Sequence, residues 1–429
     1  MGVNNDMYHI LHTIRSPFEE KAMSNLDEIC NKYPMERVND CILALNMGSS
    51  SLKFKLFDVL TRKMKVSGIA NSSDGKFLEF LVKDSEGRIL EPWFLSKKDK
   101  KGVIDEFIQW LKSHEKEFPL VCIGHRIVQG GPAHFNPIVI NQEVISDLEK
   151  YIYLAPNHLP EEIDLINTFG AAFEGIKQIA CFDTCFHQNM PHNARYYPLD
   201  EKYKASGLIR YGFHGLSYEF IMQRLAEQIL HPARQKIIIA HLGNGASMVA
   251  VKKGISIDTT MGISPMGGMV MGTRSGDLDP GVMLLLMKQE DLNADQLDDL
   301  LSKHSGMLAI AGSGDVEELL DQEKINPKAK EALCLFCYQA KKSIGALAAA
   351  MGGLDTLVFT GGIGTHSSVI RERICHDLSF LGIILEQQAN QNNSEIISAE
   401  SSWVTVCALE TNEEQIIAQH AYDLLNPKI

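Results

Sequence analysis

The pattern of apolar and polar positions divides most of the chain into two stretches, each of which begins with strands and continues with helices. In the first stretch, apolar runs of strand length lie at residues 41–47, 51–60, 63–70, 77–84, 120–128 and 176–186. Helical periodicity lies between them, at residues 101–118 and 142–156. Strands followed by an alternation of helix and strand predict an α/β fold.

The same pattern then starts again. Three short strands separated by turns are predicted within residues 236–262, and a fourth lies at 354–364. Helices are predicted at residues 280–289, 294–306, 331–353 and 367–382. Residues 1–40 precede both stretches and predict an N-terminal helical appendage with a break near Pro17, whose function the sequence does not reveal.

The openings of the two stretches resemble each other. "ILALNMGSSSLKFKLFD" and "IIIAHLGNGASMVAVKK" both place an apolar run before a polar residue, Asn46 or His241, and then a glycine, small polar residues and a second strand. This likeness indicates an internal duplication in which both hairpins face one cleft. A coincidence between two ordinary hairpins is the alternative.

Length, charge and cysteine content narrow the class of protein. The 429 residues predict two to three domains, and the net charge of −13 argues against a nucleic-acid partner. The nine scattered cysteines do not form a disulfide framework, no apolar run has transmembrane length, and no secretory leader is present. We expect a cytoplasmic protein without a membrane partner, which binds anions only through locally focused positive groups.

Three glycine-containing turns at strand ends are candidates for phosphate binding. They are "NMGSSSLK", "HLGNGAS" and "FTGGIG". Glycine lets the backbone approach an anion closely and present its N–H groups. None of the three is a Walker loop or a dinucleotide fingerprint, so each is a weak signal alone, and their combination favours a nucleotide phosphate site.

Four charged or titratable residues lie at strand ends or in glycine-containing segments. Arg126 and Arg274 offer planar guanidinium groups that suit carboxylate or phosphate, although structural ion pairs are the alternative. Asp183 follows a predicted buried strand, where carboxylates often hold Mg²⁺. His214 lies among aromatic residues and glycine in "RYGFHGLSY", where a purely structural histidine is the common outcome.

Together these segments resemble the acetate kinases, within the wider superfamily of acetate and sugar kinases, chaperones and actin. The segments that carry the resemblance occur in family order and cover about residues 41–420: "NMGSSSLKF", "HRIVQGG", "APNHLP", "FDTCFHQNMP", "RYGFHGLSY", "HLGNGAS", "DTTMG", "PMGGMVMGTRSGDLDP", "VFTGGIG" and "TNEE". The resemblance implies two duplicated RNase-H-like domains of the actin-like ATPase type, with the active site in the cleft between them. Residues 41–187 plus 413–429 would form the first domain, and residues 188–412 the second, through which a homodimer would form.

The resemblance also implies an activity, which is the reversible transfer of the γ-phosphoryl group of ATP to acetate, giving acetyl phosphate and ADP. Arg126 would hold the acetate carboxylate, Arg274 would neutralise equatorial oxygens, His214 would donate a hydrogen bond to the same oxygens, and Asp183 would orient the reacting groups or the metal. Mg²⁺ or Mn²⁺ would lie near Asn46 and Glu413. A carboxylate is already ionised at neutral pH, so this transfer requires no strong base.

Two further sets of residues follow from the resemblance. The acetate pocket would contain Arg126, Val128, Asn157, His158, Phe213 and Pro265. The nucleotide site would contain Ser49, Ser51, Lys53, His241, Leu242, Gly243, Asn244, Gly245, Asp315, Val316, Glu317, Gly362, Ile363, Gly364, Thr365 and His366.

The sequence departs from the family pattern beside both substrates. Glu317 stands where the family usually has Arg, and Thr365 and His366 stand where it usually has Glu-Asn, so the phosphoryl donor could be another nucleotide or pyrophosphate. Asn157 replaces a usual Leu and would put a polar wall in the acyl pocket, which leaves propionate as an alternative acceptor. A non-catalytic nucleotide-sensing module and a sugar kinase are alternatives of other classes.

Overall fold

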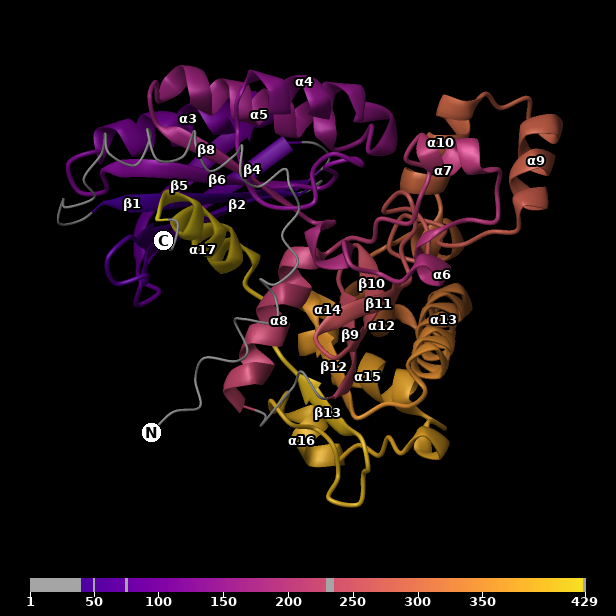
Figure 1. Cartoon of the computed structure of the whole chain (residues 1–429). Helices are drawn as coiled ribbons and strands as arrows, with labels where there is room; N and C mark the ends of the chain where they lie inside the picture. Colours follow the sequence, from indigo (N-terminus) through magenta and orange to yellow (C-terminus); the bar gives the residue numbers. More distant parts are fainter. Residues whose placement is uncertain (1–39, 49–50, 74–75, 229–234, 427–429) are drawn as a thin grey trace.

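The computed structural model describes residues 40–48, 51–73, 76–228 and 235–426, which form two sheets with helices around them (Figure 1). Ser49 and nearly all of the predicted N-terminal appendage lie outside the described residues. Within the described residues, no helix is long and apolar enough to cross a membrane.

The first sheet contains eight described strands in the order β5-β4-β3-β2-β1-β6-β8-β7. They are β1 (Cys41–Met47), β2 (Ser51–Asp58), β3 (Met64–Ser73), β4 (Lys76–Asp84), β5 (Ile89–Lys98), β6 (Leu120–Ile127), β7 (Ile138–Val139) and β8 (Lys177–Phe182). The second sheet has the order β11-β10-β9-β12-β13. Its described strands are β9 (Lys236–Leu242), β10 (Ala246–Lys252), β11 (Ile255–Thr259), β12 (Thr356–Thr360) and β13 (Thr405–Ala408).

The two sheets share one topology, which supports the internal duplication. In both, the opening strand pairs antiparallel with the next strand along the chain, β1 with β2 and β9 with β10. The opening strand also pairs parallel with a later strand, β1 with β6 and β9 with β12. Five strands of the first sheet, β3-β2-β1-β6-β8, therefore match the whole order of the second sheet.

Helices cover both faces of the first sheet (Figure 1). The helices α3 (Lys100–Ser113), α4 (Gln142–Lys150) and α5 (Leu159–Ala172) lie on one side, and α17 (Glu413–Leu425) lies on the other. Alternate residues of β1 point to opposite faces. Leu43 accordingly packs in the core that contains Phe107 of α3, whereas Ile42 packs in the core that contains Ile416 of α17.

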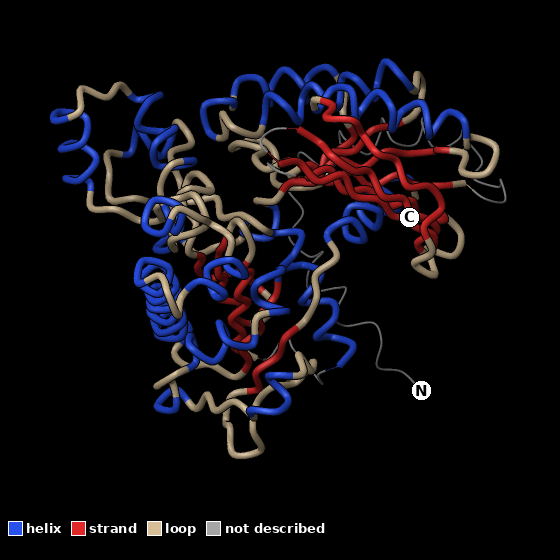
Figure 2. The backbone as a smooth tube through the Cα atoms, turned by 180° about the vertical axis from the view of Figure 1, so that it is seen from behind, coloured by secondary structure: helices blue, strands red, loops and turns tan. Residues whose placement is uncertain are grey.

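The remaining helices are distributed around the second sheet. They are α6 (His192–Arg195), α7 (Glu201–Ala205), α8 (Gly215–Gln228), α9 (Pro280–Gln289), α10 (Ala294–Lys303), α11 (Gly306–Ala311), α12 (Val316–Gln322), α13 (Pro327–Met351), α14 (Gly361–His366), α15 (Ser368–Cys375) and α16 (Gln387–Gln391), with 3₁₀ turns at Ile152–Leu154, Cys185–His187 and Ser379–Leu381. Figure 2 shows from behind that the second sheet lies beneath the first and is flanked by helices.

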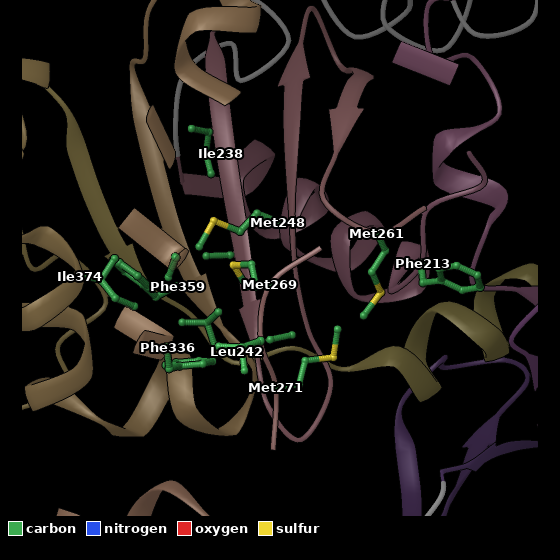
Figure 3. Close-up of a cluster of buried hydrophobic side chains, with 14 of the residues drawn as sticks. Phe213, Ile238, Leu242, Met248, Met261, Met269, Met271, Phe336, Phe359 and Ile374 are labelled. Atoms are coloured by element: carbon green, nitrogen blue, oxygen red, sulfur yellow. The ribbon is translucent and has the colours of Figure 1, made fainter. Parts of the chain in front are cut away.

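The largest core extends from the second half into the first, where it contains Ile127 and Phe182, and it supports the second glycine turn. Ile238 and Leu242 of β9, Met248 of β10 and Phe336 of α13 are fully buried within it (Figure 3). Helix α8 connects the halves, because its Leu216 packs in the core that contains α17 while Ile221 packs with strands of the second sheet. The prediction of an α/β fold with two duplicated sheets is confirmed.

Candidate active site

A cavity of about 790 Å³ is lined by residues from both halves of the molecule, among them both hairpins that the sequence indicated. Its volume falls within the range of about 300–1,000 Å³ that is typical of ligand pockets. The first hairpin contributes Gly48, Ser51 and Lys53, and the second contributes Gly243, Asn244 and Gly245.

Arg126 reaches the cavity from the C-terminal end of β6 and forms a two-pronged ion pair with Asp183, which follows β8. Its Nε donates to Asp183 Oδ1 at 3.0 Å and its Nη2 to Oδ2 at 2.5 Å. A third donor, Nη1, lies 3.3 Å from the carbonyl oxygen of Met47. Burial alone would lower the pKa of Arg126, but the charges of Asp183 and Glu413 raise it above its usual range. The guanidinium group is therefore fixed and permanently charged.

Arg274 approaches from the second half, in the loop that follows β11. Its Nη1 donates to the carbonyl oxygen of Pro265 at 3.1 Å, and it forms no ion pair within the described residues. Burial and the like charge of Arg126 lower its pKa. A partly buried positive charge without an acidic partner, beside a second arginine, attracts an anion.

His214 is held in an uncommon backbone conformation with φ of 60°. The backbone N–H of the next residue, Gly215, donates to the carbonyl oxygen of Asp183 at 2.8 Å. A Cβ atom on Gly215 would lie 2.3 Å from that oxygen, so only glycine fits at this position. Left-handed backbone at a non-glycine residue is typical of functional sites, where the surrounding structure fixes it.

The ring of His214 stacks on the ring of His241, with centroids 4.2 Å apart and planes 17° apart. His214 Nδ1 lies 2.8 Å from Ser247 Oγ, and His241 Nδ1 lies 2.8 Å from Ser217 Oγ. Burial, followed by the neighbouring His241 and arginine groups, holds the pKa of His214 well below its usual value. Burial lowers the pKa of His241 to about 4. Both rings are therefore neutral at physiological pH.

Val128, Phe213 and Pro265 form an apolar wall in the cavity, which His158 also lines. Burial, followed by the charges of Arg274 and Arg126, lowers the pKa of His158 to about 3. Behind this wall, the buried carboxyl of Glu162 accepts the backbone N–H of Val128 at 3.1 Å.

Asn157 does not line the cavity, contrary to the sequence-based expectation. Its side chain is exposed, and its amide donates to Asp298 Oδ2 at 3.2 Å. The reason is its position two residues before α5, where the chain turns outward to start that helix. The polar wall expected from the substitution of Leu by Asn is thus absent from the acyl side of the cavity.

The start of α17 returns to the first hairpin and brings two glutamates to the cavity. Asn46 Nδ2 donates at 2.8 Å to both Glu413 Oε2 and Glu414 Oε1. Lys55 Nζ forms an ion pair of 3.1 Å with Glu414 and contacts Asn412 Oδ1 at 2.6 Å. Within the described part of the chain, no three acidic, histidine or cysteine groups form a cluster that could hold a metal ion by themselves.

The far end of the cavity is lined by the starts of α12 and α14, and acidic groups occur at α12. Asp315 caps α12, accepting the N–H groups of Glu317 and Glu318 at 2.9 and 3.0 Å. Glu317 itself borders the cavity, as do Gly362, Ile363 and the exposed His366.

Three predicted nucleotide-site residues lie behind the cavity wall and not on it. Leu242 is fully buried in the largest core. Gly364 and Thr365 are buried because the fully buried Arg371 binds both of their carbonyl oxygens, at 2.9 and 2.7 Å. Thr365 Oγ1 lies 3.3 Å from the carbonyl oxygen of Leu409 and does not reach the cavity. The substitution at Thr365 therefore acts on packing, whereas His366 faces the cavity.

The structure also brings to the cavity residues that the sequence did not single out. They are Gly314, Leu320, Gly361, Ser367, Thr411 and Glu414. Glu414 could have been found from the doubled acid in "TNEE", since one of two consecutive glutamates at a helix start faces inward. The other residues lie close to predicted residues along the chain, and the geometry of their loops brings them to the cavity.

Two sheets of equal topology, with glycine hairpins and two arginines around one cleft, define a phosphotransferase of the actin-like ATPase fold. The family model described as "Acetokinase family" matches residues 41–419, and the chain belongs to this family. The sequence-based assignment is therefore confirmed.

Named relatives agree with this assignment. The chain is similar to the acetate kinase of Rickettsia akari, with 39% identity over 90% of this chain and 100% of the relative. It is 41% identical to the acetate kinase of Caldanaerobacter subterraneus over 90% and 98% of the two chains.

Solved structures give the same result. A propionate kinase from Francisella tularensis matches with a TM-score of 0.83 and 33% identity, over 90% of this chain and 99% of that one. Porphyromonas gingivalis acetate kinase matches with a TM-score of 0.78 and 35% identity, over 90% and 100%.

Proposed function

We propose that this protein transfers the γ-phosphoryl group of ATP to the carboxylate of acetate, reversibly, giving acetyl phosphate and ADP. Two anions meet in such a reaction, so positive charge has to neutralise the transferring group. Arg126 and Arg274 supply this charge from opposite halves, and His214 supplies a neutral hydrogen-bond donor. His214 and Arg274 both approach Gly245. A Cβ atom at Gly245 would lie 3.3 Å from His214 Nε2 and 3.4 Å from Arg274 Nη1, so glycine leaves room for both groups.

The observation that carries the proposal is the state of Asp183. Both of its oxygens accept from Arg126, and its side chain is 1% exposed. Arg126 therefore engages both oxygens, and neither is left without a donor to take a proton from a hydroxyl group. His158, His214 and His241 have lowered pKa values, which makes them weak bases. The site is thus suited to an acceptor that is already ionised, such as a carboxylate, and is poorly suited to the hydroxyl group of a sugar.

A magnesium ion fits this site as a companion of the nucleotide. Mg²⁺ is usually held by one or two carboxylates together with substrate phosphates. Glu413 and the amide oxygen of Asn46 are the groups that would hold it, and Mn²⁺ would take the same oxygen ligands. When bound, the ion would neutralise charge on the β- and γ-phosphates.

The acidic end of the cavity favours a nucleotide over pyrophosphate as donor. Glu317 and the free oxygen of Asp315 accept hydrogen bonds from hydroxyl or amino groups and repel phosphates. A ribose and base suit this end, and we propose ATP as the donor. The departures at Glu317 and His366 make other nucleotides the main competitors.

Acetate and propionate both suit the apolar wall of Val128, Phe213 and Pro265. One methylene group changes discrimination by only about 1–3 kcal/mol. The absence of Asn157 from this wall removes an obstacle to the larger acid. Propionate is therefore the second candidate acceptor.

We also propose a homodimer that forms through the second half. Helix α9 presents Val282, Leu284 and Leu285 to solvent, with exposed fractions of 41%, 57% and 52%. Apolar side chains grouped in this way are typical of an interaction surface. The domain boundaries at residues 187/188 and 412/413, and the cytoplasmic location, stay predictions.

A hydroxamate assay for acyl phosphate tests the proposal. Acetate, propionate and butyrate would each be supplied with ATP, GTP and pyrophosphate, in the presence and absence of Mg²⁺. We expect product with acetate, ATP and Mg²⁺ at the highest kcat/KM. Absence of product with every combination would refute the carboxylate kinase, and turnover with pyrophosphate alone would refute the donor.

A further inference from the structure

A buried chain of hydroxyl groups stands behind the ring of His214. Ser247 Oγ lies 2.8 Å from His214 Nδ1, and the phenol oxygen of Tyr218 hydrogen-bonds to the same Ser247 Oγ. Ser247 belongs to β10 and Tyr218 to α8, and both are 0% exposed. The other ring nitrogen, Nε2, faces Gly245 at the cavity.

Counting protons decides which way these hydrogen bonds run. The chain has two bonds, and Tyr218 and Ser247 contribute one hydroxyl proton each. Within the described residues, Tyr218 has no hydrogen-bond partner other than Ser247. If His214 Nδ1 carried a proton as well, three protons would share two bonds, and either the phenol proton of Tyr218 or the hydroxyl proton of Ser247 would have no acceptor. A buried donor without an acceptor is strongly disfavoured.

We propose that Tyr218 and Ser247 are positioning residues that lock His214 in the tautomer protonated at Nε2. Tyr218 donates to Ser247, Ser247 donates to Nδ1, and Nε2–H is left to donate into the cavity. A neutral histidine in the other tautomer would present a lone pair to the transferring group and would repel its oxygens. The inference deepens the proposed function and rests on it for the meaning of the cavity.

The fixed tautomer explains how a neutral histidine can donate a hydrogen bond to the transferring group beside two arginines. Burial and the nearby positive groups hold the ring of His214 neutral, which removes the second proton that a charged ring would carry. Only one nitrogen can then donate, so the ring becomes a donor to phosphate only if the protein selects the tautomer. The hydroxyl chain performs this selection without adding charge.

The direct test is nitrogen NMR of the protein labelled with ¹⁵N in its histidines, with the His214 signals assigned from their loss in His214→Asn. We expect a protonated Nε2 and an unprotonated Nδ1 in the wild type at neutral pH. Ser247→Ala should give a mixture of tautomers, and Ser247→Thr, which keeps the hydroxyl, should restore the wild-type pattern. A wild-type ring protonated at Nδ1, or an unchanged pattern in Ser247→Ala, would overturn the proposal.

Kinetics supply a second measurement. In acyl phosphate formation, Ser247→Ala should lower kcat by about 10- to 100-fold with KM for both substrates nearly unchanged, because a bond to the transferring group is made fully only in the transition state. Tyr218→Phe should lower kcat less. The double variant should be no worse than Ser247→Ala, since both act through one chain of bonds. Additive effects in the double variant, or a change in KM alone, would contradict a shared positioning role.

Ser256→Ala is the matched control. Ser256 Oγ lies 2.9 Å from Nδ1 of the buried His187, whose Nε2 faces the carbonyl oxygen of Phe213 and not the cavity. This variant should lower the melting temperature as Ser247→Ala does, yet keep the His214 signals and kcat. If the protein forms no acyl phosphate at all, the proposed function fails, while the NMR pattern still decides the tautomer lock.

Discussion

At the scale of single residues, the two arginines of the cavity differ in how they are compensated. Arg126 is paired with Asp183, whereas Arg274 forms no ion pair within the described residues. Removing one partner of a buried ion pair costs about 3–5 kcal/mol, so Arg126→Ala would destabilise the fold as well as the reaction. A substitution of Arg274, which has no such partner in the described part of the chain, would measure the effect on the reaction without the effect on stability.

We therefore predict that Arg274→Ala lowers kcat/KM by about 10²–10³-fold, the loss found when one donor to a developing oxyanion is removed. Its free energy of unfolding should change by less than about 1 kcal/mol, because loss of the bond to Pro265 is offset by relief of the repulsion with Arg126. Steady-state kinetics and urea unfolding measure both quantities. An active variant would show that Arg274 is not needed for the reaction, and one that unfolds would show that it has a structural role.

Buried neutral histidines predict how stability depends on pH. His125 is 1% exposed, and burial lowers its pKa to about 4, against the hydrogen bond to Gln178. The unfolded chain takes up a proton near pH 6.5 and the folded chain does not, so the stability present above pH 6.5 is lost as pH falls toward 4. This one group accounts for about 1.4 kcal/mol per pH unit in that window.

His125→Gln isolates the contribution, since glutamine does not titrate. Urea unfolding at several pH values should show a smaller loss of stability between about pH 6.5 and about pH 4.5 in the variant than in the wild type. The buried Glu162, whose pKa is raised by burial to about 8, acts in the opposite direction in both proteins and cancels in the comparison. Parallel curves for the two proteins would contradict the prediction.

At the scale of elements, the first turn of α17 carries two glutamates with different tasks. Glu414 is 5% exposed and bonds to both Lys55 and Asn46, which lowers its pKa despite burial. Glu413 bonds to Asn46, and Arg126 Nε lies 3.8 Å from it. The first arrangement anchors the helix to the sheet, and the second leaves an oxygen available to a metal ion.

We predict that Glu414→Ala lowers the free energy of unfolding by about 3 kcal/mol, because it breaks an ion pair whose carboxylate is buried and leaves the half-buried Lys55 without its charge partner. Glu413→Gln should leave the unfolding transition nearly unchanged and raise the Mg²⁺ concentration needed for half-maximal activity. Chemical unfolding and a metal titration of the initial rate check the pair. If Glu413→Gln lowered stability and Glu414→Ala changed only the Mg²⁺ requirement, the roles of the two glutamates would have to be exchanged.

Elements with strong periodicity were predictable from the sequence, and elements set by tertiary contacts were not. Strands β1, β2 and β9 lie close to where their apolar runs placed them. Strand β5 was missed because Pro92 weakens its pattern, and the structure places it at the edge of the sheet, where proline is tolerated.

The candidate site, too, could be predicted from the sequence only in part. Its catalytic candidates were predictable because strand ends and glycine-containing segments mark them, and Arg126, Asp183, His214 and Arg274 all border one cavity. Asn157 and Thr365 were placed at the site by their positions in the family pattern. Whether a side chain faces a cavity depends on the turn before α5 and on Arg371 in the core, and no local sequence pattern reports either.

At the scale of the whole molecule, the duplicated sheets place their hairpins and arginines across one cavity, so each half supplies part of the site. Lys53 and Arg126 come from the first half, and Asn244 and Arg274 from the second. The largest core contains side chains of both halves, and helix α8 packs against α17 and against strands of the second sheet, so both connect the halves. Helix α9 of the second half contributes no residue to the cavity lining.

The exposed face of α9 predicts that the 47.7 kDa chain sediments as a dimer. The double variant Leu284→Glu/Leu285→Glu should sediment as a single chain, because it would bring four charges into an apolar interface that cannot solvate them. Leu60→Glu is the control, since Leu60 is also an exposed leucine but lies on the first half, and it should leave the dimer intact. Analytical ultracentrifugation at several concentrations measures the three masses. A wild type of single-chain mass, or a double variant that stays dimeric, would rule out an interface through α9.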